Sequence, residues 1–555
     1  MSEQIKITVI EEVDRGRPAG KGSGGKKTVL FHDAGKTLLH TLREGGIQLP
    51  SLCGSIGKCG RCQVKFHGQA PLPSPADRAI ISPDKLREGY RLACTVRPRK
   101  SITVETAFGK EAEVHVVVGS STEGGWKDSG CGKNDVGGER VRGRKGFAGE
   151  GMVAAVDIGT TTIAMQLMEA ESGQVLDTYT CLNPQRSYGT DVISRIRAGT
   201  EGEGERMKRL VREALAAGLE HMLGGNALSE EDRNGNALGE EAWNRKPGMP
   251  KLMVIAANTV MGHLFMGYPV ETLGRSPFSP VNIKTVTLDF LGIPTILIPG
   301  ISAFVGGDIV SGLYACGLYP FRGVMSGVPM KDAMKMGETH SHAGRRQRQR
   351  EKAWLFLDLG TNAEMVIGKG NRIACTAAAA GPAFEGRGRQ GRNGSERIEA
   401  IAFLLEKGII DRGGLLKDPY FETGIEVELE DKKGKIRILQ EDIRDIQMAK
   451  AAVRAGIYFL MKRMGITDVD EIERVYVAGG FGFYLKREAA VEIGLVPAGL
   501  GEKMEAVGNT SLAGAKLMGM RGLSEDMEAL ALKAEAFQLA DELLFEEKYI
   551  EYMNF

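Results

Sequence analysis

The pattern of apolar and polar residues divides the chain into parts with different predicted structures. Residues 5–10 (IKITVI) and 27–31 (KTVLF) alternate apolar with polar side chains, as strands do, and the polar stretch between them predicts a hairpin loop. Residues 119–151 are rich in glycine and nearly devoid of aliphatic side chains. Such a segment cannot bury a core, so we expect a mobile linker there.

From Met152 onward, apolar strands alternate with amphipathic helices, which predicts an α/β architecture. Apolar residues at helical spacing between Glu441 and Gly465 indicate a long helix that packs on a core. Polar inserts interrupt this region at about 225–250 and 331–352. The second insert is basic and contains His340 and His342, and we interpret it as a solvated loop rather than a metal or nucleic-acid site.

An internal repeat lies within the long α/β region. Residues 152–162 (MVAAVDIGTTT) are echoed by residues 354–364 (WLFLDLGTNAE), and each copy is an apolar strand that ends in Asp, x, Gly, Thr. A second apolar strand follows each turn. The echo predicts two halves built on one plan.

Length and charge narrow the classes of function. At about 150 residues per domain, 555 residues predict three or four units. The 72 Lys and Arg residues nearly balance the 71 Asp and Glu residues, so no basic field favours a nucleic acid or an anionic membrane as partner. The acidic start of the chain lacks the features of a signal peptide, and the apolar stretch 291–305 is too short to span a bilayer. We therefore expect a cytoplasmic protein.

Four of the eight cysteines crowd the first hundred residues, with the spacing Cys53-x5-Cys59-x2-Cys62 and then 31 residues to Cys94. In a long chain of this kind a local cluster suggests metal ligation more than disulfides. Zinc sites pair their ligands in two short knuckles, whereas here three cysteines share one glycine-rich loop. A [2Fe–2S] cluster fits this arrangement best, with zinc or unligated thiols as the alternatives.

The two repeated turns have the chemistry of a phosphate site. Glycine permits a tight turn, turn N–H groups and threonine hydroxyls can face a phosphate, and an aspartate can hold Mg²⁺, often through water. A third element, residues 475–482 (VYVAGGFG), is a strand that runs into glycines, where a base and ribose can lie on the backbone. No P-loop and no dinucleotide-binding fingerprint occurs in the sequence.

These motifs carry resemblances to known families. The first hundred residues, including TLREGGIQLPSLCG and GYRLACTV, resemble the plant-type and adrenodoxin-type ferredoxins, with the longer first spacing of the adrenodoxin branch. The three later motifs resemble the phosphate-1, phosphate-2 and adenosine motifs of the superfamily of sugar kinases, chaperone ATPases and actin. The combination resembles the reductive activators of corrinoid proteins, as do residues 183–196, 257–267, 306–312, 375–386 and 508–515.

The resemblance implies a multidomain α+β and α/β protein, with an N-terminal β-grasp ferredoxin followed by a duplicated ribonuclease-H-like, actin-like ATPase fold. The expected divisions are a ferredoxin domain at 1–108, a linker at 109–150, a first half at 151–330, an insert at 331–352 and a second half at 353–555. Glycines and threonines of the turns would bind the nucleotide, and the cysteines would bind the cluster: Gly159, Thr160, Thr161, Gly360, Thr361, Asn362, Gly479, Gly480 and Gly482; Cys53, Cys59, Cys62 and Cys94.

The implied activity is the ATP-dependent return of one electron from the cluster to cobalt(II) of a corrinoid protein in a methyltransferase system. Asp157 and Asp358 would organise Mg²⁺, and Glu364 and Asp308 are candidates for activating water. An upstream electron donor is implied, and a homodimer is left open. Two other functions stay open: a small-molecule kinase with a regulatory iron–sulfur domain, and a plain ferredoxin-type electron carrier.

Overall fold

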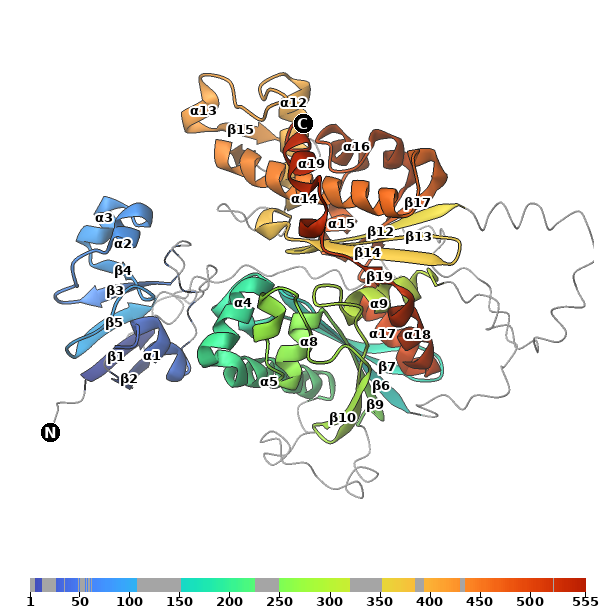
Figure 1. Ribbon diagram of the computed structural model, residues 1–555. Helices are drawn as coiled ribbons and strands as arrows, with labels where there is room; N and C mark the ends of the chain where they lie inside the picture. Colours follow the sequence, from blue (N-terminus) through green and yellow to red (C-terminus); the bar gives the residue numbers. More distant parts are fainter. Residues whose placement is uncertain are drawn as a thin grey trace, which may run out of the picture.

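The computed structural model describes residues 5–11, 26–33, 35–47, 49, 55, 57, 60, 62–106, 151–224, 249–319, 352–384, 394–429, 435–522 and 524–555. The expected linker at 109–150, most of both polar inserts, Cys53 and Cys59 lie outside these residues. The described chain forms a small N-terminal unit beside two larger α/β halves (Figure 1).

The N-terminal unit is a five-stranded mixed sheet in the order β2-β1-β5-β3-β4. The predicted hairpin is present, since β1 and β2 pair antiparallel, while β1 and β5 pair in parallel. Leu38, Leu39 and Leu42 of the first helix are buried against Ile7 and Val9 of the sheet. The elements of this unit are β1 (Ile5–Glu11), β2 (Lys26–His32), α1 (Leu38–Glu44), β3 (Gln63–His67), α2 (Pro75–Ile80), α3 (Pro83–Arg87), β4 (Tyr90–Leu92) and β5 (Ile102–Thr106).

The first larger half is built on a six-stranded sheet in the order β10-β11-β9-β6-β7-β8. Every residue of β9 is buried, as expected for a parallel strand covered on both faces. The elements of this half are β6 (Met152–Ile158), β7 (Thr162–Glu169), β8 (Val175–Leu182), η1 (Pro184–Tyr188), α4 (Val192–Ala198), η2 (Gly199–Glu203), α5 (Gly204–Met222), β9 (Leu252–Ala257), α8 (Thr259–Met266), η3 (Glu271–Gly274), β10 (Val286–Phe290), β11 (Ile293–Leu297) and α9 (Gly307–Ala315).

The second half has the sheet order β18-β17-β12-β13-β14-β19 and a small separate hairpin, β15–β16. The helix expected at 441–465 is α14. The elements are β12 (Ala353–Leu359), β13 (Ala363–Lys369), β14 (Arg372–Ala378), η4 (Gly381–Ala383), α12 (Gly394–Glu406), α13 (Tyr420–Thr423), β15 (Ile425–Glu428), β16 (Lys435–Ile438), α14 (Gln440–Arg463), η5 (Val469–Glu471), β17 (Ile472–Ala478), α15 (Gly479–Tyr484), α16 (Arg487–Glu492), η6 (Ala498–Lys503), β18 (Met504–Gly508), α17 (Thr510–Arg521), α18 (Ser524–Lys533), β19 (Glu535–Ala536), η7 (Leu539–Asp541) and α19 (Phe545–Glu551).

The two sheets repeat one topology, which confirms the duplicated fold. In each half three antiparallel strands form a meander, β6-β7-β8 or β12-β13-β14. A later strand then pairs in parallel with the first strand of the meander: β9 with β6, and β17 with β12. The first strands of both meanders, β6 and β12, carry the two repeated Asp-x-Gly-Thr sequences.

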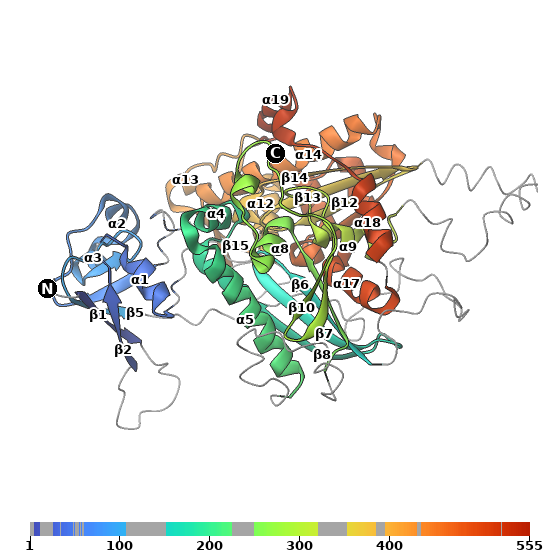
Figure 2. The same cartoon turned by 60° about the horizontal axis from the view of Figure 1, so that its bottom comes forward.

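The two halves share a core around α9 and α17. Although α17 follows β18 of the second half, Gly312 of α9 lies so close to α17 that an added Cβ would stand 2.7 Å from Thr510 Oγ1. Phe356 of β12 and Met518 of α17 belong to the same buried cluster as Val153 of β6. In Figure 1 and in the rotated view of Figure 2, α17 and α18 (red) accordingly lie beside α9, and α17 also lies against β6 and β9 of the first sheet. The last part of the chain therefore joins the two halves.

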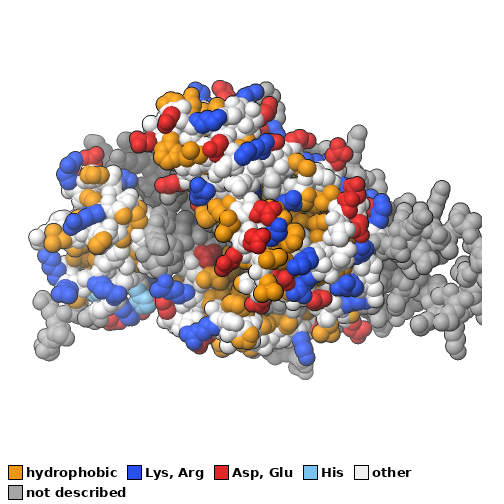
Figure 3. Space-filling view, turned by 45° about the horizontal axis from the view of Figure 1, so that its top comes forward, with side chains coloured by type: hydrophobic (Ala, Val, Ile, Leu, Met, Phe, Trp, Pro, Cys, Tyr) orange, Lys and Arg blue, Asp and Glu red, His pale blue; other side chains and the backbone are white. Residues whose placement is uncertain are grey.

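No helix among the described residues is long and apolar enough to cross a membrane. On the face drawn in Figure 3, acidic and basic side chains are interspersed, in keeping with the balanced charge of the sequence.

Candidate functional site

The repeated turns close two tight β-hairpins at the ends of β6 and β12. The Gly159 N–H donates to the Thr162 carbonyl at 2.9 Å, and the Gly360 N–H donates to the Asn362 carbonyl at 2.9 Å. A Cβ at position 159 would lie 2.8 Å from the Thr162 oxygen, so the first turn requires glycine. Both turns thus have the compact form that a phosphate-binding hairpin needs.

Asp157, at the end of β6, is held by α17 from the far part of the chain. Its Oδ2 accepts a hydrogen bond from Asn509 Nδ2 at 2.9 Å, and its Oδ1 accepts one from Ser511 Oγ at 2.8 Å. Burial raises the pKa of Asp157, and these two hydrogen bonds act against that rise. Asn509 and Ser511 were not predicted as site residues, although the stretch 508–515 resembles the family.

The four predicted acidic residues, Asp157, Asp308, Asp358 and Glu364, influence one another electrostatically. Asp358 and Glu364 are directly opposite on β12 and β13, and Asp308 lies in the first turn of α9. Burial first, and then the charge of Asp157, raise the pKa of Asp358 to about 7. Burial, with Asp358 as the next cause, raises the pKa of Asp308 to about 8.

Glu364 is the most enclosed of these acids, with 6% of its surface exposed. Burial, followed by the charges of Asp308 and Asp358, raises its pKa well above the usual range. Repulsion among such carboxylates would be relieved by a cation, so this acidic group fits Mg²⁺. Within the described ranges, no three His, Cys, Asp or Glu side chains converge enough to ligate a metal. Magnesium held by one or two carboxylates, phosphate oxygens and water is compatible with that geometry.

The glycines of the third motif lie beside the second turn. Gly479 has a φ of +84°, and a Cβ there would stand 2.8 Å from Asp358 Oδ1, so the start of α15 meets the end of β12. Gly480 is exposed, whereas Gly482 is buried, with its missing Cβ leaving room for Val477. The backbone of this motif is therefore accessible to a ligand at Gly479 and Gly480. Gly482 is placed to let α15 pack on β17.

The first turn is held by hydrogen bonds from several polar side chains that were not predicted as site residues. Asn258 Nδ2 donates to Thr160 Oγ1 at 3.0 Å, and Asn183 Nδ2 donates to the Gly159 carbonyl at 2.8 Å. The fully buried Arg195 donates to the Thr160 carbonyl. Around the second turn, Thr361 is buried and Asn362 half-buried. Thr161 is half-buried and accepts, through its carbonyl, from the Asn183 N–H at 2.9 Å.

Of the four predicted cluster ligands, the structure describes Cys62 and Cys94, and both are buried. They lie on adjoining backbone segments, because the Ala93 N–H donates to the Cys62 carbonyl at 2.8 Å. In the loop before them, Gly57 and Gly60 have φ values of +76° and +69°. Such left-handed residues let a loop coil tightly, so this part of the chain fits a cluster held by thiolates.

Replacing Asp358 with asparagine should have opposite effects on the apoprotein and on the nucleotide complex. A carboxyl whose folded pKa is about 7 destabilises the fold as pH rises from its ordinary value of 3.8 through 7, because the folded state then has to ionise it. At pH 8 the nucleotide-free variant should melt roughly 2–5 °C higher. Its affinity for Mg-ATP should fall about tenfold, since an amide is a poorer partner for the metal.

The matched control is Asp470→Asn, whose side chain is 83% exposed in the same half, and it should change neither quantity. Melting curves at pH 5.5 and 8, with calorimetric titration of Mg-ATP, give both measurements. Wild-type affinity in the Asp358 variant would show that the second turn is an ordinary hairpin.

Comparison with known families agrees with this geometry in three places. The model described as "C-terminal domain of RACo the ASKHA domain" matches residues 352–392 and 389–555, and the model described as "RACo middle region" matches 152–238 and 242–320. The "2Fe-2S iron-sulfur cluster binding domain" matches residues 23–99. The match to the iron–sulfur domain supports a [2Fe–2S] cluster, and the match to the ASKHA domain supports nucleotide binding.

Similar proteins carry related names. The corrinoid activation enzyme RamQ of Eubacterium limosum is 27% identical in an alignment of 421 positions, which covers 65% of this chain and 63% of RamQ. The [Co(II) methylated amine-specific corrinoid protein] reductase of Methanosarcina barkeri is 28% identical in an alignment of 232 positions, which covers 33% of this chain and 42% of that protein. This chain therefore spans less than two thirds of the length of both relatives.

A solved structure titled "Reductive activator for corrinoid,iron-sulfur protein" has the same fold, with a TM-score of 0.57, 22% identity, and coverage of 99% of this chain and 98% of that one. Two RACo domain models account for most of residues 152–555, and the iron–sulfur domain model precedes them in the order that the sequence predicted. Because the two RACo domain models together match more than half of its residues, the chain belongs to the RACo family.

Proposed function

We propose that this protein passes a low-potential electron from a [2Fe–2S] cluster to cobalt(II) of a corrinoid protein, with the help of ATP, and so regenerates cobalt(I) for methyl transfer. The observation that carries the proposal is one chain in which a ferredoxin-type unit lies against an ATPase fold with two phosphate-type turns. The names of RamQ and of the Methanosarcina reductase support this choice of target.

Energetics give ATP a reason to be present. A ferredoxin-type cluster has a potential near −400 mV. Cobalt(I) is more strongly reducing, and each 59 mV of deficit in a one-electron step costs about 1.4 kcal/mol. Binding of ATP can offset this deficit by favouring one state of the protein, up to the difference in its affinity for the two states.

The cluster residues have one role in this proposal. Cys53, Cys59, Cys62 and Cys94 would hold the irons through their thiolates, and the bound cluster would supply one-electron chemistry. The two described cysteines, Cys62 and Cys94, are buried. That burial protects the site from water and oxidants.

The nucleotide residues divide by their position. Asp157 and Asp358 would orient the magnesium ion, while the turn residues Thr160, Thr161, Thr361 and Asn362 would contact phosphates. Gly479 and Gly480 would line the adenosine, and the buried Gly482 leaves room for Val477, so that α15 packs on β17. Glu364 and Asp308 are the proposed residues for activating water, because Glu364 lies directly opposite Asp358 on β13 and Asp308 lies in the first turn of α9.

Closure of the two halves is the mechanical output. Asp157 belongs to the first half but is hydrogen-bonded by Asn509 and Ser511, which follow β18 of the second half. A nucleotide that draws the two turns together acts directly on this junction. We also propose an upstream electron donor, a cytoplasmic location and the domain limits given above, with homodimer formation left open.

ATP turnover distinguishes the proposed activator from a small-molecule kinase. With Mg-ATP present, the natural corrinoid partner should raise ATP turnover severalfold, because the proposed function acts on a protein. Sugars and polyols, which are typical acceptors of a kinase, should not raise it. Phosphate release and mass spectrometry of the candidate acceptors measure both. A phosphorylated small molecule, with no response to the corrinoid protein, would favour the kinase.

A further inference from the structure

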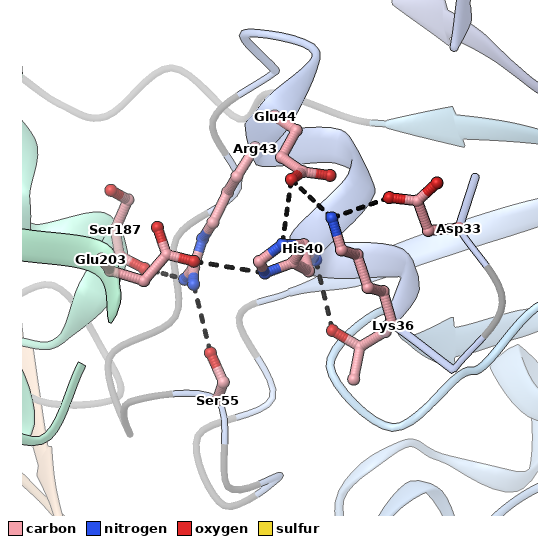
Figure 4. A network of polar contacts seen from close by, with 9 residues as sticks. Asp33, Lys36, His40, Arg43, Glu44, Ser55, Ser187 and Glu203 are labelled. Atoms are coloured by element: carbon pink, nitrogen blue, oxygen red, sulfur yellow. Dashed lines mark hydrogen bonds and ion pairs between the residues drawn. The ribbon is translucent and has the colours of Figure 1, made fainter. Parts of the chain in front are cut away.

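The ferredoxin unit contacts the first half through a polar network centred on α1 (Figure 4). Arg43 extends from α1 across the boundary, and only 7% of its surface is exposed. Its Nη2 donates to the Ser187 carbonyl in η1. Its guanidinium carbon also lies 4.6 Å from the centre of the Tyr188 ring, a cation–π contact.

Arg43 also touches the loop that carries the cluster cysteines. Its Nη1 donates to Ser55 Oγ at 3.3 Å, and Ser55 stands between Cys53 and Cys59 in the sequence. Burial lowers the pKa of Arg43, while the nearby Tyr188, Glu203 and Cys62 act in the opposite direction. One side chain therefore links the cluster loop to the ATPase fold.

A second contact crosses the same boundary. His40 Nδ1 lies 3.2 Å from Glu203 Oε1 at the end of η2, and His40 Nε2 lies 3.2 Å from Glu44 within α1. Lys36 completes the network inside the ferredoxin unit, at 2.8 Å from Glu44 and 2.9 Å from Asp33. The contact is thus made by one face of α1 on η1 and η2.

The opposite side of η1 reaches the first phosphate-type turn. Asn183, the N-cap of η1, donates from its N–H to the Thr161 carbonyl and from its side chain to the Gly159 carbonyl. Just beyond η1, the Gly189 carbonyl accepts from Arg195 Nε at 3.0 Å, and Arg195 also donates to the Thr160 carbonyl. The short η1 segment is therefore fixed to the turn at both of its ends.

We infer that η1 is the docking site for the protein's own ferredoxin domain, that Arg43 anchors this docking, and that nucleotide at the first turn strengthens it. The inference rests on the proposed nucleotide site. Phosphate bound by the N–H and hydroxyl groups of the turn would order the turn, and with it the carbonyls that hold Asn183 and Arg195. An ordered η1 keeps the Ser187 carbonyl and the Tyr188 ring in place for Arg43.

The coupling between nucleotide binding and docking of the ferredoxin unit can be measured through either process. If nucleotide favours docking, docking must favour nucleotide by the same factor. Removing the anchor should therefore weaken nucleotide binding, although Arg43 belongs to the ferredoxin unit and makes its described contacts with η1 and the cluster loop. A coupling of about fivefold is within the usual range.

The test uses the full chain and needs no corrinoid protein. Arg43→Ala should weaken binding of Mg²⁺ with a non-hydrolysable ATP analogue about fivefold by calorimetry. It should also enlarge the particle in small-angle X-ray scattering, because the ferredoxin unit is released. Arg43→Lys keeps the charge but loses the planar fork, and should give an intermediate result.

Lys36→Ala is the matched control, since it removes ion pairs of the same network that stay within the ferredoxin unit. It should match wild type in both measurements. Glu203→Gln tests the contact from the ATPase side and should shift both readouts in the direction of Arg43→Ala. Unchanged affinity and dimensions in Arg43→Ala would overturn the inference. A wild-type protein that does not bind the analogue at all would instead contradict the proposed function.

Discussion

Wild-type protein prepared without oxygen should carry two irons and two sulfides per chain, and Cys59→Ala should lose them and its red-brown colour. Three thiolates cannot complete the four-cysteine ligand set of a [2Fe–2S] cluster. Electron delivery should consequently fall to background, the largest loss expected from a single substitution. Iron and sulfide analysis with visible and electron paramagnetic resonance spectra measures the outcome.

Two comparisons separate loss of the cluster from loss of the fold. Cys181→Ala changes a half-buried cysteine on β8, outside the cluster motif, and should keep the full iron content. Cys59→Ala should still bind Mg-ATP, since the turns lie in the other units of the chain. Stoichiometric zinc without iron, after anaerobic purification and reconstitution, would contradict the cluster assignment.

Local patterns in the sequence predicted much of the fold. The alternation of apolar and polar residues in 5–10 and 27–31 predicted the β1–β2 hairpin, and the helical spacing of apolar residues after Glu441 predicted α14. The repeated Asp-x-Gly-Thr sequence gave the duplicated sheets, because each copy ends the first strand of a meander. The fold class and the family are confirmed. These features could be predicted because each depends on residues close together in the chain.

Contacts between distant segments could not be predicted in the same way. Asn509 and Ser511 reach Asp157 across more than 350 positions, as the separations of 352 and 354 show. In the sequence, Asn509 looks like an ordinary N-cap residue, and it is in fact the N-cap of α17. No local pattern shows that it also binds Asp157. The same reason applies to Arg43 and Ser187, which are 144 positions apart.

The predicted roles of single residues differ in how the geometry supports them. Gly479 lies where an added side chain would meet Asp358, which supports a place at the nucleotide. Gly482 looks the same in the sequence, yet its missing Cβ is filled by Val477. Cys53, Cys59, the linker at 109–150 and the histidines at 340 and 342 lie outside the described residues, so what was predicted of them stays a prediction.

ATP should decide whether the electron reaches cobalt. With a strong reductant, an oxidised corrinoid protein and Mg-ATP, the wild-type protein should convert cobalt(II) to cobalt(I). Suppose that ATP shifts the protein's equilibrium toward its electron-delivering state by about 2.7 kcal/mol. Without ATP that state is then roughly a hundredfold less populated, and the conversion should slow by the same factor. Cys59→Ala should be inactive with or without ATP, because it lacks the cluster.

The most direct measurement is therefore the visible spectrum of the natural corrinoid partner during this reaction, recorded with and without Mg-ATP. The natural partner is needed because its docking surface sets specificity. We expect the cobalt(I) spectrum to appear rapidly with Mg-ATP and only slowly without it. Equal rates under the two conditions would contradict a role for ATP, and would make the protein a ferredoxin whose ATPase fold takes no part in electron delivery.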